Sequence, residues 1–191
     1  MKHKAPLLIL AAGAAVRMGM PKGLAPVNGG TLLDYQLKHS SPYFQQIHIV
    51  TGAHHKKYCA AFPNLRFIKN PHWKLGPFSS LITGLRQIPH QHGLWILPID
   101  CPSPSPTTWE MLFAQQGPVI KPTYQGQGGH PVFLSTGIIK KLLQVNLNSP
   151  DARLDRQLKK LNPQQITRVP VDDRKVSLNL NTPESLLTID I

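Results

Sequence analysis

Cysteine, acidic residues and long apolar runs are all scarce in this sequence, and each scarcity argues against a class of protein. The two cysteines, Cys59 and Cys101, stand far apart and outside any CxxC pair. A disulfide framework is therefore not expected, and a reducing cytoplasm is. No apolar run approaches the roughly 20 residues that span a bilayer, so we expect no membrane partner.

Acidic residues number 9 against 21 lysines and arginines, which gives a net charge of +12. Such a charge attracts polyanions, whether nucleic acids, acidic membrane surfaces or phosphorylated small molecules. The sequence has no basic block interleaved with aromatic residues and no basic amphipathic helix, so nucleic acid is the less favoured partner. The nine histidines include residues 54–55 and 90–92, which we assign to surface loops because no cysteine or carboxylate stands at zinc spacing from them.

Length and composition predict one domain over residues 1–191. A chain of 191 residues, 41% of them apolar, is long enough for one sizeable core and short for two. Its 19 prolines and 14 glycines predict many short elements joined by turns. Repeats and low-complexity tracts are absent, so nothing indicates a linker. We expect a monomer or a weak homodimer.

Apolar runs alternate with helix-like segments along the chain. Because the runs are continuous rather than alternating, they predict strands buried on both faces, as in a parallel sheet. Their alternation with helices predicts an α/β fold with three layers, α/β/α, around a mostly parallel central sheet. The expected strands are residues 5–11, 46–51, 65–69, 93–99, 118–122, 130–134 and 165–171. The expected helices are residues 31–38, 54–61, 78–88, 107–116, 137–145 and 152–161.

In such sheets ligands bind outside the carboxyl ends of the strands, so function is expected just after Ala11, Thr51, Lys69 and Ile99. The first of these ends carries LAAGAAVRMGMPK, residues 10–22. Its small side chains let backbone N–H groups approach an anion, and Arg17 and Lys22 add two cations. Neither GxGxxG nor GxxxxGK[ST] is present.

The same stretch has a second reading, as a secretory signal with a charged start, an apolar run over residues 5–16 and small residues. The following RMGMPK suits a phosphate-binding loop and is not needed by a cleavage site. Removal of the run would also delete the first strand. We therefore expect this segment to belong to the fold.

LPIDCP, residues 97–102, places Asp100 at the end of the most apolar strand. A carboxylate there is costly to bury without a partner, and Mg²⁺ bound by few carboxylates and by substrate phosphates would be a suitable one. The alternative is a turn or helix cap that leads into residues 103–106. Cys101 is not expected to act as a nucleophile, because no histidine is placed by sequence to activate it.

These motifs resemble those of the MobA/MocA-like NTP transferases, the molybdenum cofactor cytidylyl- and guanylyltransferase-like family. The family signature LAAGxSxRMGxPK is matched at the expected spacing, except that Ala14–Ala15 stands where relatives often have serine. The residues that match are Gly13, Arg17, Met18, Gly19, Pro21 and Lys22. The resemblance implies a single Rossmann-like nucleotidyltransferase domain of the GT-A-like kind.

Three later segments are similar to family motifs, and each also has a purely structural reading. GPFSSLITGL, residues 76–85, resembles a base- and ribose-binding segment, or Ser79 or Ser80 caps an amphipathic helix. GGHPVFLS, residues 128–135, resembles an acceptor-side segment, or His130 is a turn residue. NLNTPES, residues 179–185, resembles the NxNTPE element of MobA-type enzymes, in which Asn181 would face the metal, or Asn181 or Thr182 caps a helix from Pro183.

By this resemblance the chain moves NMP from an NTP to a phosphorylated acceptor, taken to be molybdopterin, in a Mg²⁺-dependent reaction that releases pyrophosphate. CTP is favoured and GTP is the other option, because LAAG and GHP are typical of the cytidine-using branch and NLNTPE of the other. The implied sites are catalytic (Arg17, Lys22, Asp100), nucleotide-binding (Leu10, Ala11, Ala12, Gly13, Arg17, Lys22, Gly76, Ser79, Ser80), metal-binding (Asp100, Asn181) and acceptor-side (Gly129, His130).

Three alternatives remain at this point. The acceptor could be a sugar phosphate or polyol phosphate instead of molybdopterin. The chain could be a non-catalytic nucleotide-binding protein of the same fold, which asparagines at 179 and 181 would suit through weaker metal binding. Nonspecific nucleic-acid binding driven by charge would show a steep salt dependence without need for Mg²⁺. The basic stretch over residues 153–160 is assigned to a solvated helix face.

Overall fold

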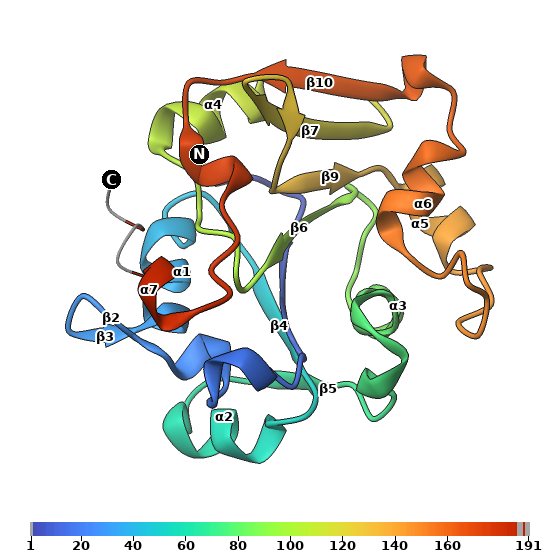
Figure 1. The fold of residues 1–191 in the computed structure, drawn as a ribbon. Helices are drawn as coiled ribbons and strands as arrows, with labels where there is room; N and C mark the ends of the chain where they lie inside the picture. The colour runs from blue at the N-terminus through green and yellow to red at the C-terminus, as the bar shows by residue number, and fades with distance from the viewer. Residues whose placement is uncertain (1, 187–188, 190–191) are drawn as a thin grey trace.

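The computed structural model describes residues 2–186 and 189, and a twisted central sheet runs through it (Figure 1). The strand β1 (Leu7–Ala11) lies in the middle of this sheet. It pairs in parallel with β4 (Ile47–Thr51) on one side and β6 (Leu94–Pro98) on the other, and β4 pairs in parallel with β5 (Phe67–Lys69). The predicted strands over residues 5–11, 46–51, 65–69 and 93–99 are thus confirmed, and their carboxyl ends meet at one edge.

The other half of the sheet contains one reversed strand. β9 (Val132–Leu134) runs antiparallel to both β6 and β7 (Val119–Tyr124), whereas β10 (Ile166–Pro170) is parallel to β7. The reversal starts at Gln125 and Gly126, whose φ values of 49° and 79° are those of a tight hairpin turn between β7 and β8 (Gln127–Gly128). The order β10-β7-β9-β6-β1-β4-β5 confirms a mostly parallel sheet.

Helices cover both faces of the sheet, which confirms the three-layer α/β/α architecture (Figure 1). One apolar core joins Leu7 and Ile9 to the helices α1 (Leu32–Ser40) and α4 (Pro106–Phe113). The other core joins Leu8 to the opposite layer. That layer consists of α3 (Pro77–Gln87), α5 (Thr136–Leu142) and α6 (Leu154–Lys159). Successive residues of β1 therefore face opposite cores, as a strand buried on both faces requires.

Hydroxyl caps fix the starts of three helices. Thr31 accepts a hydrogen bond from the Asp34 amide while the Asp34 carboxylate accepts one from the Thr31 amide, so a capping box begins α1. Ser105 and Ser135 cap α4 and α5 through their hydroxyl oxygens, which accept from the amides of Thr108 and Ile138. Since capped helices begin at defined residues, these ends lie within one or two residues of the predicted boundaries.

The smaller elements were only partly predicted. The hairpin of β2 (Pro26–Val27) and β3 (Gly30–Thr31) was not predicted, although Asn28-Gly29 is a strong hairpin turn sequence. The helices α2 (His55–Ala61) and α7 (Pro183–Leu186) begin close to where the sequence indicated. Short 3₁₀ helices fill the remaining turns: η1 (Val16–Met18), η2 (Lys22–Leu24), η3 (Trp73–Leu75), η4 (Pro163–Gln165) and η5 (Arg174–Ser177). No helix among the described residues has the length and apolarity needed to cross a membrane.

Candidate active site

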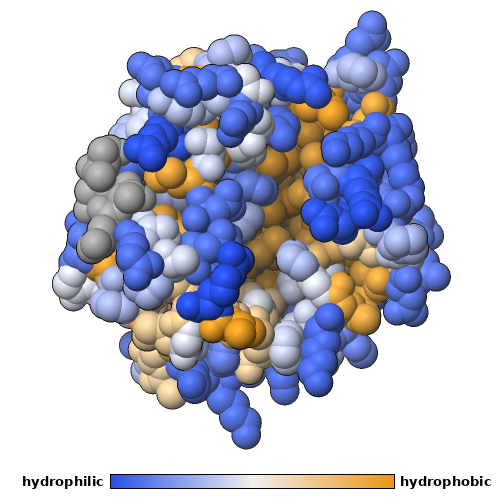
Figure 2. Space-filling view, in the orientation of Figure 1, coloured by the Kyte–Doolittle hydropathy of each residue, from blue (hydrophilic) through white to orange (hydrophobic). Residues whose placement is uncertain are grey.

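A cavity of about 460 Å³ opens at the carboxyl ends of β1 and β6. Figure 2 shows it as a hollow in the middle of the face, with apolar walls and a hydrophilic rim. The end of β1 and the loop after it line the cavity with residues 10–18 and Lys22, and α2 contributes Tyr58. Its other walls come from Trp73, Lys74, Gly76, Pro77, Ser80, Pro98, Ile99, Asp100 and Asn181. The cavity thus lies just after Ala11 and Ile99, two of the four strand ends at which function was expected.

The loop after β1 presents hydrogen-bond donors to this cavity. The backbone N–H groups of residues 13–15 donate to no residue that the structure describes, and Gly13 is exposed. Ala15 has a φ of 51°, a left-handed conformation that non-glycine residues rarely adopt, and Gly19 follows at 65°. Exposed Arg17 forms no ion pair within residues 2–186. Free amides and a free cation together make this loop a suitable anion site.

Lys22, at the end of the same loop, contacts the two residues predicted to bind metal. Its Nζ donates to Asp100 Oδ2 at 2.6 Å and to Asn181 Oδ1 at 2.7 Å. The Lys22 and Asp100 side chains are 18% and 23% exposed, so the pair is shielded but reachable from the cavity. Leu180 N donates to the Asp100 carbonyl oxygen at 2.7 Å, and this contact brings Asn181 to the end of β6.

The alternative reading of Asp100 as a helix cap is wrong, because Ser105 caps α4. The neighbouring Cys101 is buried, and burial first, with the Asp100 carboxylate second, raises the pKa of its thiol far above the usual range despite the opposing effect of Lys22. The thiol is therefore protonated at neutral pH, in agreement with its exclusion as a nucleophile.

In the segment before α3, only the structural reading of the serines is contradicted. Gly76, with a φ of 93°, is the N-cap of α3, so the alternative that Ser79 or Ser80 caps this helix is wrong, and the nucleotide-binding role of the segment stays a prediction. Asn70 Nδ2 donates to Ser79 Oγ at 2.9 Å and to Ser80 Oγ at 3.0 Å. Ser80 lines the cavity and Ser79, buried behind it, does not. Asn70 fixes both, and its place after β5 was the available sequence signal.

Gly129 and His130 do not line the cavity. Gly129 packs against the Val176 carbonyl oxygen, where a Cβ atom would clash, and His130 N donates to the same oxygen at 2.9 Å. Burial, aided by the Lys121 ammonium and opposed by Asp100, lowers the pKa of His130 to about 4. Its Nδ1 is buried with no partner among the described residues. Their acceptor-side role stays a prediction.

The sequence did not indicate three of the residues that line the cavity. These are Tyr58, Trp73 and Lys74, and Lys74 Nζ lies 5.9 Å from the centre of the Trp73 ring.

The assignment of residues 54–55 to a surface loop is wrong, because both are half-buried. His54 Nε2 lies 2.9 Å from the Ala14 carbonyl oxygen, and His55 Nδ1 lies 2.7 Å from Thr51 Oγ1.

The side-chain oxygens around Lys22 are suited to bind a hard cation. The Asp100 and Asn181 oxygens both accept from the Lys22 ammonium, which occupies the position that a metal ion bound by these two oxygens would take. No group of three histidine, cysteine or acidic side chains that could hold a metal occurs in the described part of the chain. Two oxygen ligands suit Mg²⁺, which keeps several waters and takes further ligands from substrate phosphates.

Comparisons with known proteins agree with this site. Residues 7–166 match the family model of the MobA-like NTP transferase domain. The molybdenum cofactor cytidylyltransferase of Escherichia coli (strain K12) is 25% identical over 186 residues, which cover 95% of this chain and 93% of that protein. A probable molybdenum cofactor guanylyltransferase of Bacillus cereus (strain AH187) is 29% identical over 112 residues, 56% of this chain and only 54% of that protein.

The fold also matches a solved structure. The crystal structure of Rv0371c from Mycobacterium tuberculosis H37Rv superimposes with a TM-score of 0.81. The match covers 99% of this chain and 100% of that one at 20% sequence identity. At that identity the match establishes a common fold.

Proposed function

The chain belongs to the MobA-like NTP transferase family, and from this premise we propose that it transfers NMP from an NTP to a phosphorylated acceptor and releases pyrophosphate. One observation carries the proposal. Arg17, Lys22 and Asp100, which come from two separate segments, line one cavity together with the free amides of the loop after β1. This combination suits an anionic substrate with a metal ion.

CTP is the proposed donor and molybdopterin the proposed acceptor. The cytidylyltransferase match extends over 95% of the chain, whereas the guanylyltransferase match covers 56%. The LAAG sequence that opens the first loop supports the same choice. GTP is the second donor to test, because the asparagines at 179 and 181 are typical of the guanylyl branch.

Asp100 and Asn181 would hold the Mg²⁺ ion through the oxygens that now accept from Lys22. When bound there, Mg²⁺ would withdraw charge from the α-phosphate and offset the charge of the pyrophosphate. Its role is confined to charge compensation at the reacting phosphorus.

The residues of the chain bind and orient the two substrates. The amides of residues 13–15 and the Arg17 guanidinium face the β- and γ-phosphates, where they stabilise charge that grows on the leaving group. An oxygen of the acceptor phosphate attacks the α-phosphorus, and the bond between that phosphorus and the bridging oxygen to the β-phosphate breaks. Since the attacking oxygen is already anionic, no general base is required, and catalysis is mostly positioning.

A thermal-shift panel with CTP, GTP, ATP and UTP in the presence of Mg²⁺ tests the donor. A ligand at 100 times its Kd adds about 2.7 kcal/mol to the free energy of unfolding, which raises Tm by roughly 5–10 °C in a domain of this size. We expect that shift for CTP. Equal small shifts with all four, abolished by salt, would instead indicate generic attraction of polyanions.

A pyrophosphate-release assay then tests turnover and acceptor. Molybdopterin is expected to support release with CTP and Mg²⁺. Release with ribitol 5-phosphate or glucose 1-phosphate in place of molybdopterin would overturn the acceptor assignment and leave nucleotidyl transfer standing. Triphosphate binding without release on any acceptor would identify a non-catalytic nucleotide-binding protein.

A further inference from the structure

We propose that His54 and Tyr58 are positioning residues that attach the phosphate-binding loop, residues 13–23, to α2 at both of its ends. The inference rests on the proposed function, because it takes the loop to bind the triphosphate. In Figure 1, α2 lies directly below the segment that carries η1 and η2. Neither residue belongs to the sequence motifs that indicated the site.

The first attachment holds the loop next to Lys22. Gly23 N donates to Tyr58 Oη at 3.0 Å. Tyr58 is 1% exposed, and Gly23 rests so closely on its ring that a Cβ atom would lie 2.7 Å from Oη. Burial raises the pKa of Tyr58 to about 12, although the bond from Gly23 opposes this, so the phenol is neutral when it accepts.

The second attachment holds the other end of the loop. His54 Nε2 lies 2.9 Å from the Ala14 carbonyl oxygen. Because a carbonyl oxygen only accepts, Nε2 carries the proton of this bond. The next residue, Ala15, has the left-handed φ of 51°, which a non-glycine residue keeps only where its surroundings hold it. The His54 contact supplies part of that constraint.

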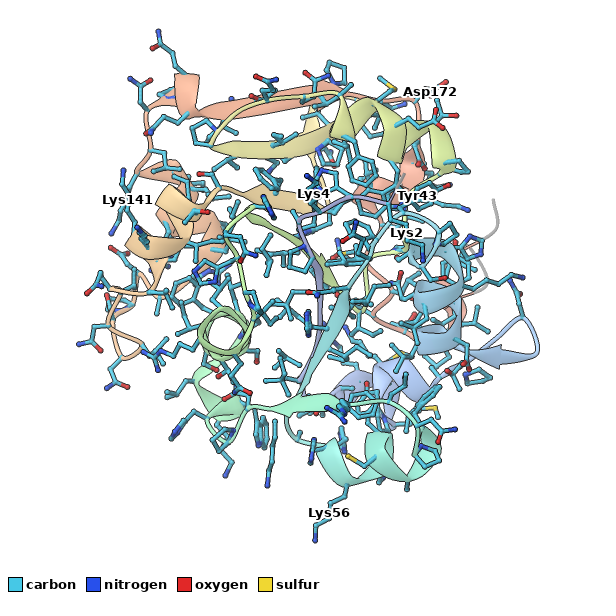
Figure 3. The ribbon with its side chains drawn as sticks, turned by 180° about the vertical axis from the view of Figure 1, so that it is seen from behind. Lys2, Lys4, Tyr43, Lys56, Lys141 and Asp172 are labelled. Atoms are coloured by element: carbon cyan, nitrogen blue, oxygen red, sulfur yellow. The ribbon has the colours of Figure 1, made fainter. Side chains whose placement is uncertain are left out.

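The two attachments lie one helical turn apart, because His54 is the N-cap of α2 and its carbonyl oxygen accepts from the Tyr58 amide at 3.2 Å. The outer face of the helix is exposed, and Figure 3 shows Lys56 pointing from α2 away from the molecule. One attachment precedes Arg17 in the chain and the other follows Lys22. The helix therefore fixes both cations before a triphosphate binds, and preorganised donors cost less to engage than mobile ones.

Calorimetric titration with CTP and Mg²⁺ tests the Tyr58 attachment. Tyr58→Phe keeps the ring and leaves the Gly23 amide without its acceptor, so we expect affinity to fall by about 5- to 20-fold. Lys56→Ala, on the outer face of the same helix, is the matched control and should bind like the wild type. Exchange of the Gly23 amide hydrogen with solvent should become at least about 10-fold faster in Tyr58→Phe.

A double-mutant cycle separates positioning from a merely structural role. If Tyr58 acts through Lys22, the effect of Tyr58→Phe on affinity should shrink to less than about twofold in a Lys22→Met background. For the second attachment, His54→Gln retains a donor to Ala14 and should retain affinity, whereas His54→Phe should lose about 5-fold or more.

The outcomes separate this inference from the proposed function. Affinities of Tyr58→Phe and His54→Phe within twofold of the wild type would overturn the inference, as would an undiminished Tyr58→Phe effect in the Lys22→Met background. A wild type that binds no triphosphate would overturn the proposed function. The attachment through Tyr58 would then be tested by hydrogen exchange of the Gly23 amide alone, and an unchanged exchange rate in Tyr58→Phe would disprove it.

Discussion

Lys22 Nζ lies 2.6 Å from Asp100 Oδ2, and this contact joins the loop after β1 to the segment that follows β6. The two residues are 78 positions apart in the chain. Asn181 Oδ1 accepts from the same ammonium at 2.7 Å. The ammonium therefore occupies the point on which two oxygen ligands converge, and a divalent cation that uses these oxygens must compete with Lys22 for them.

Lys22→Met should consequently increase the affinity for a divalent cation when no nucleotide is present. Removal of the competing charge is expected to strengthen Mn²⁺ binding by about 10-fold, which corresponds to ~1.4 kcal/mol of relieved repulsion. Titration followed by electron paramagnetic resonance of free Mn²⁺ measures this directly. Lys141→Met, on the outer side of α5 (Figure 3), removes the same charge elsewhere and should leave affinity unchanged. Equal affinity in Lys22→Met and wild type would contradict the competition.

Asp100→Asn tests the predicted metal ligand with a side chain of the same shape that lacks the negative charge. The amide oxygen of the variant can still accept from Lys22, so the free energy of unfolding should change little. Pyrophosphate release is expected to fall by about 100- to 1,000-fold, since a preorganised charge at the reacting centre is lost. Asp172→Asn, an exposed acid that Figure 3 shows at the outside of the fold, is the control. If Asp100→Asn released pyrophosphate at the wild-type rate in the presence of Mg²⁺, Asp100 would not be a metal ligand in the reaction.

The central sheet and the position of the site could be predicted from the sequence because both depend on local patterns. Continuous apolar runs identified β1, β4 and β6, and the rule that ligands bind at carboxyl ends located the cavity. The reversal at β9 depends instead on the turn at Gln125-Gly126, a weaker signal than Asn28-Gly29. The strands β8 and β9 are also too short, at two and three residues, to show a pattern of apolar residues from which their direction could be predicted.

Contacts between distant side chains could not be predicted. Lys22 was assigned to phosphates and Asp100 to metal in one shared site, and nothing in either motif indicated that the two side chains bond to each other. His54 was assigned to a surface loop because no cysteine or carboxylate stands at zinc spacing from it, although it bonds to a carbonyl group 40 positions away. Each such pair is fixed by how helices and loops pack on the sheet, and packing is not visible in one segment at a time.

Gly13→Ala separates the role of the loop from the stability of the fold. Gly13 has no positive φ, and a methyl group added at its Cα would meet no atom within 4 Å, so the free energy of unfolding should change by less than about 0.5 kcal/mol. The methyl group would stand among the free amides of residues 13–15, and we expect affinity for CTP with Mg²⁺ to fall by at least about 10-fold.

Gly137→Ala is the matched control for that variant. Gly137 is exposed in the first turn of α5, where alanine should stabilise the helix by about 0.5–1 kcal/mol without any effect on binding. Calorimetric titration and urea unfolding of both variants give the comparison. Unchanged CTP affinity in Gly13→Ala would mean that the phosphates do not approach this part of the loop.

Stability should depend on pH through His130. Its pKa in the folded chain is lowered to about 4, by burial first and the Lys121 ammonium second, against about 6.5 in the unfolded chain. Between these values the unfolded chain binds a proton that the folded chain does not, so the free energy of unfolding decreases as pH falls. The slope reaches at most about 1.4 kcal/mol per pH unit, and the total is about 3 kcal/mol. Above about pH 6.5 this group contributes no pH dependence.

Urea unfolding at pH 4.5, 5.5, 6.5 and 7.5 measures this dependence in the wild type and in His130→Gln. The variant should show a flatter decline over that window whatever its absolute stability, because it lacks the group whose protonation differs between the two states. His3 and His48, whose pKa values burial also lowers, remain in both proteins and cancel in the comparison. Equal slopes in wild type and His130→Gln would show that His130 is protonated as readily in the folded chain as in the unfolded one, which would contradict the lowered pKa.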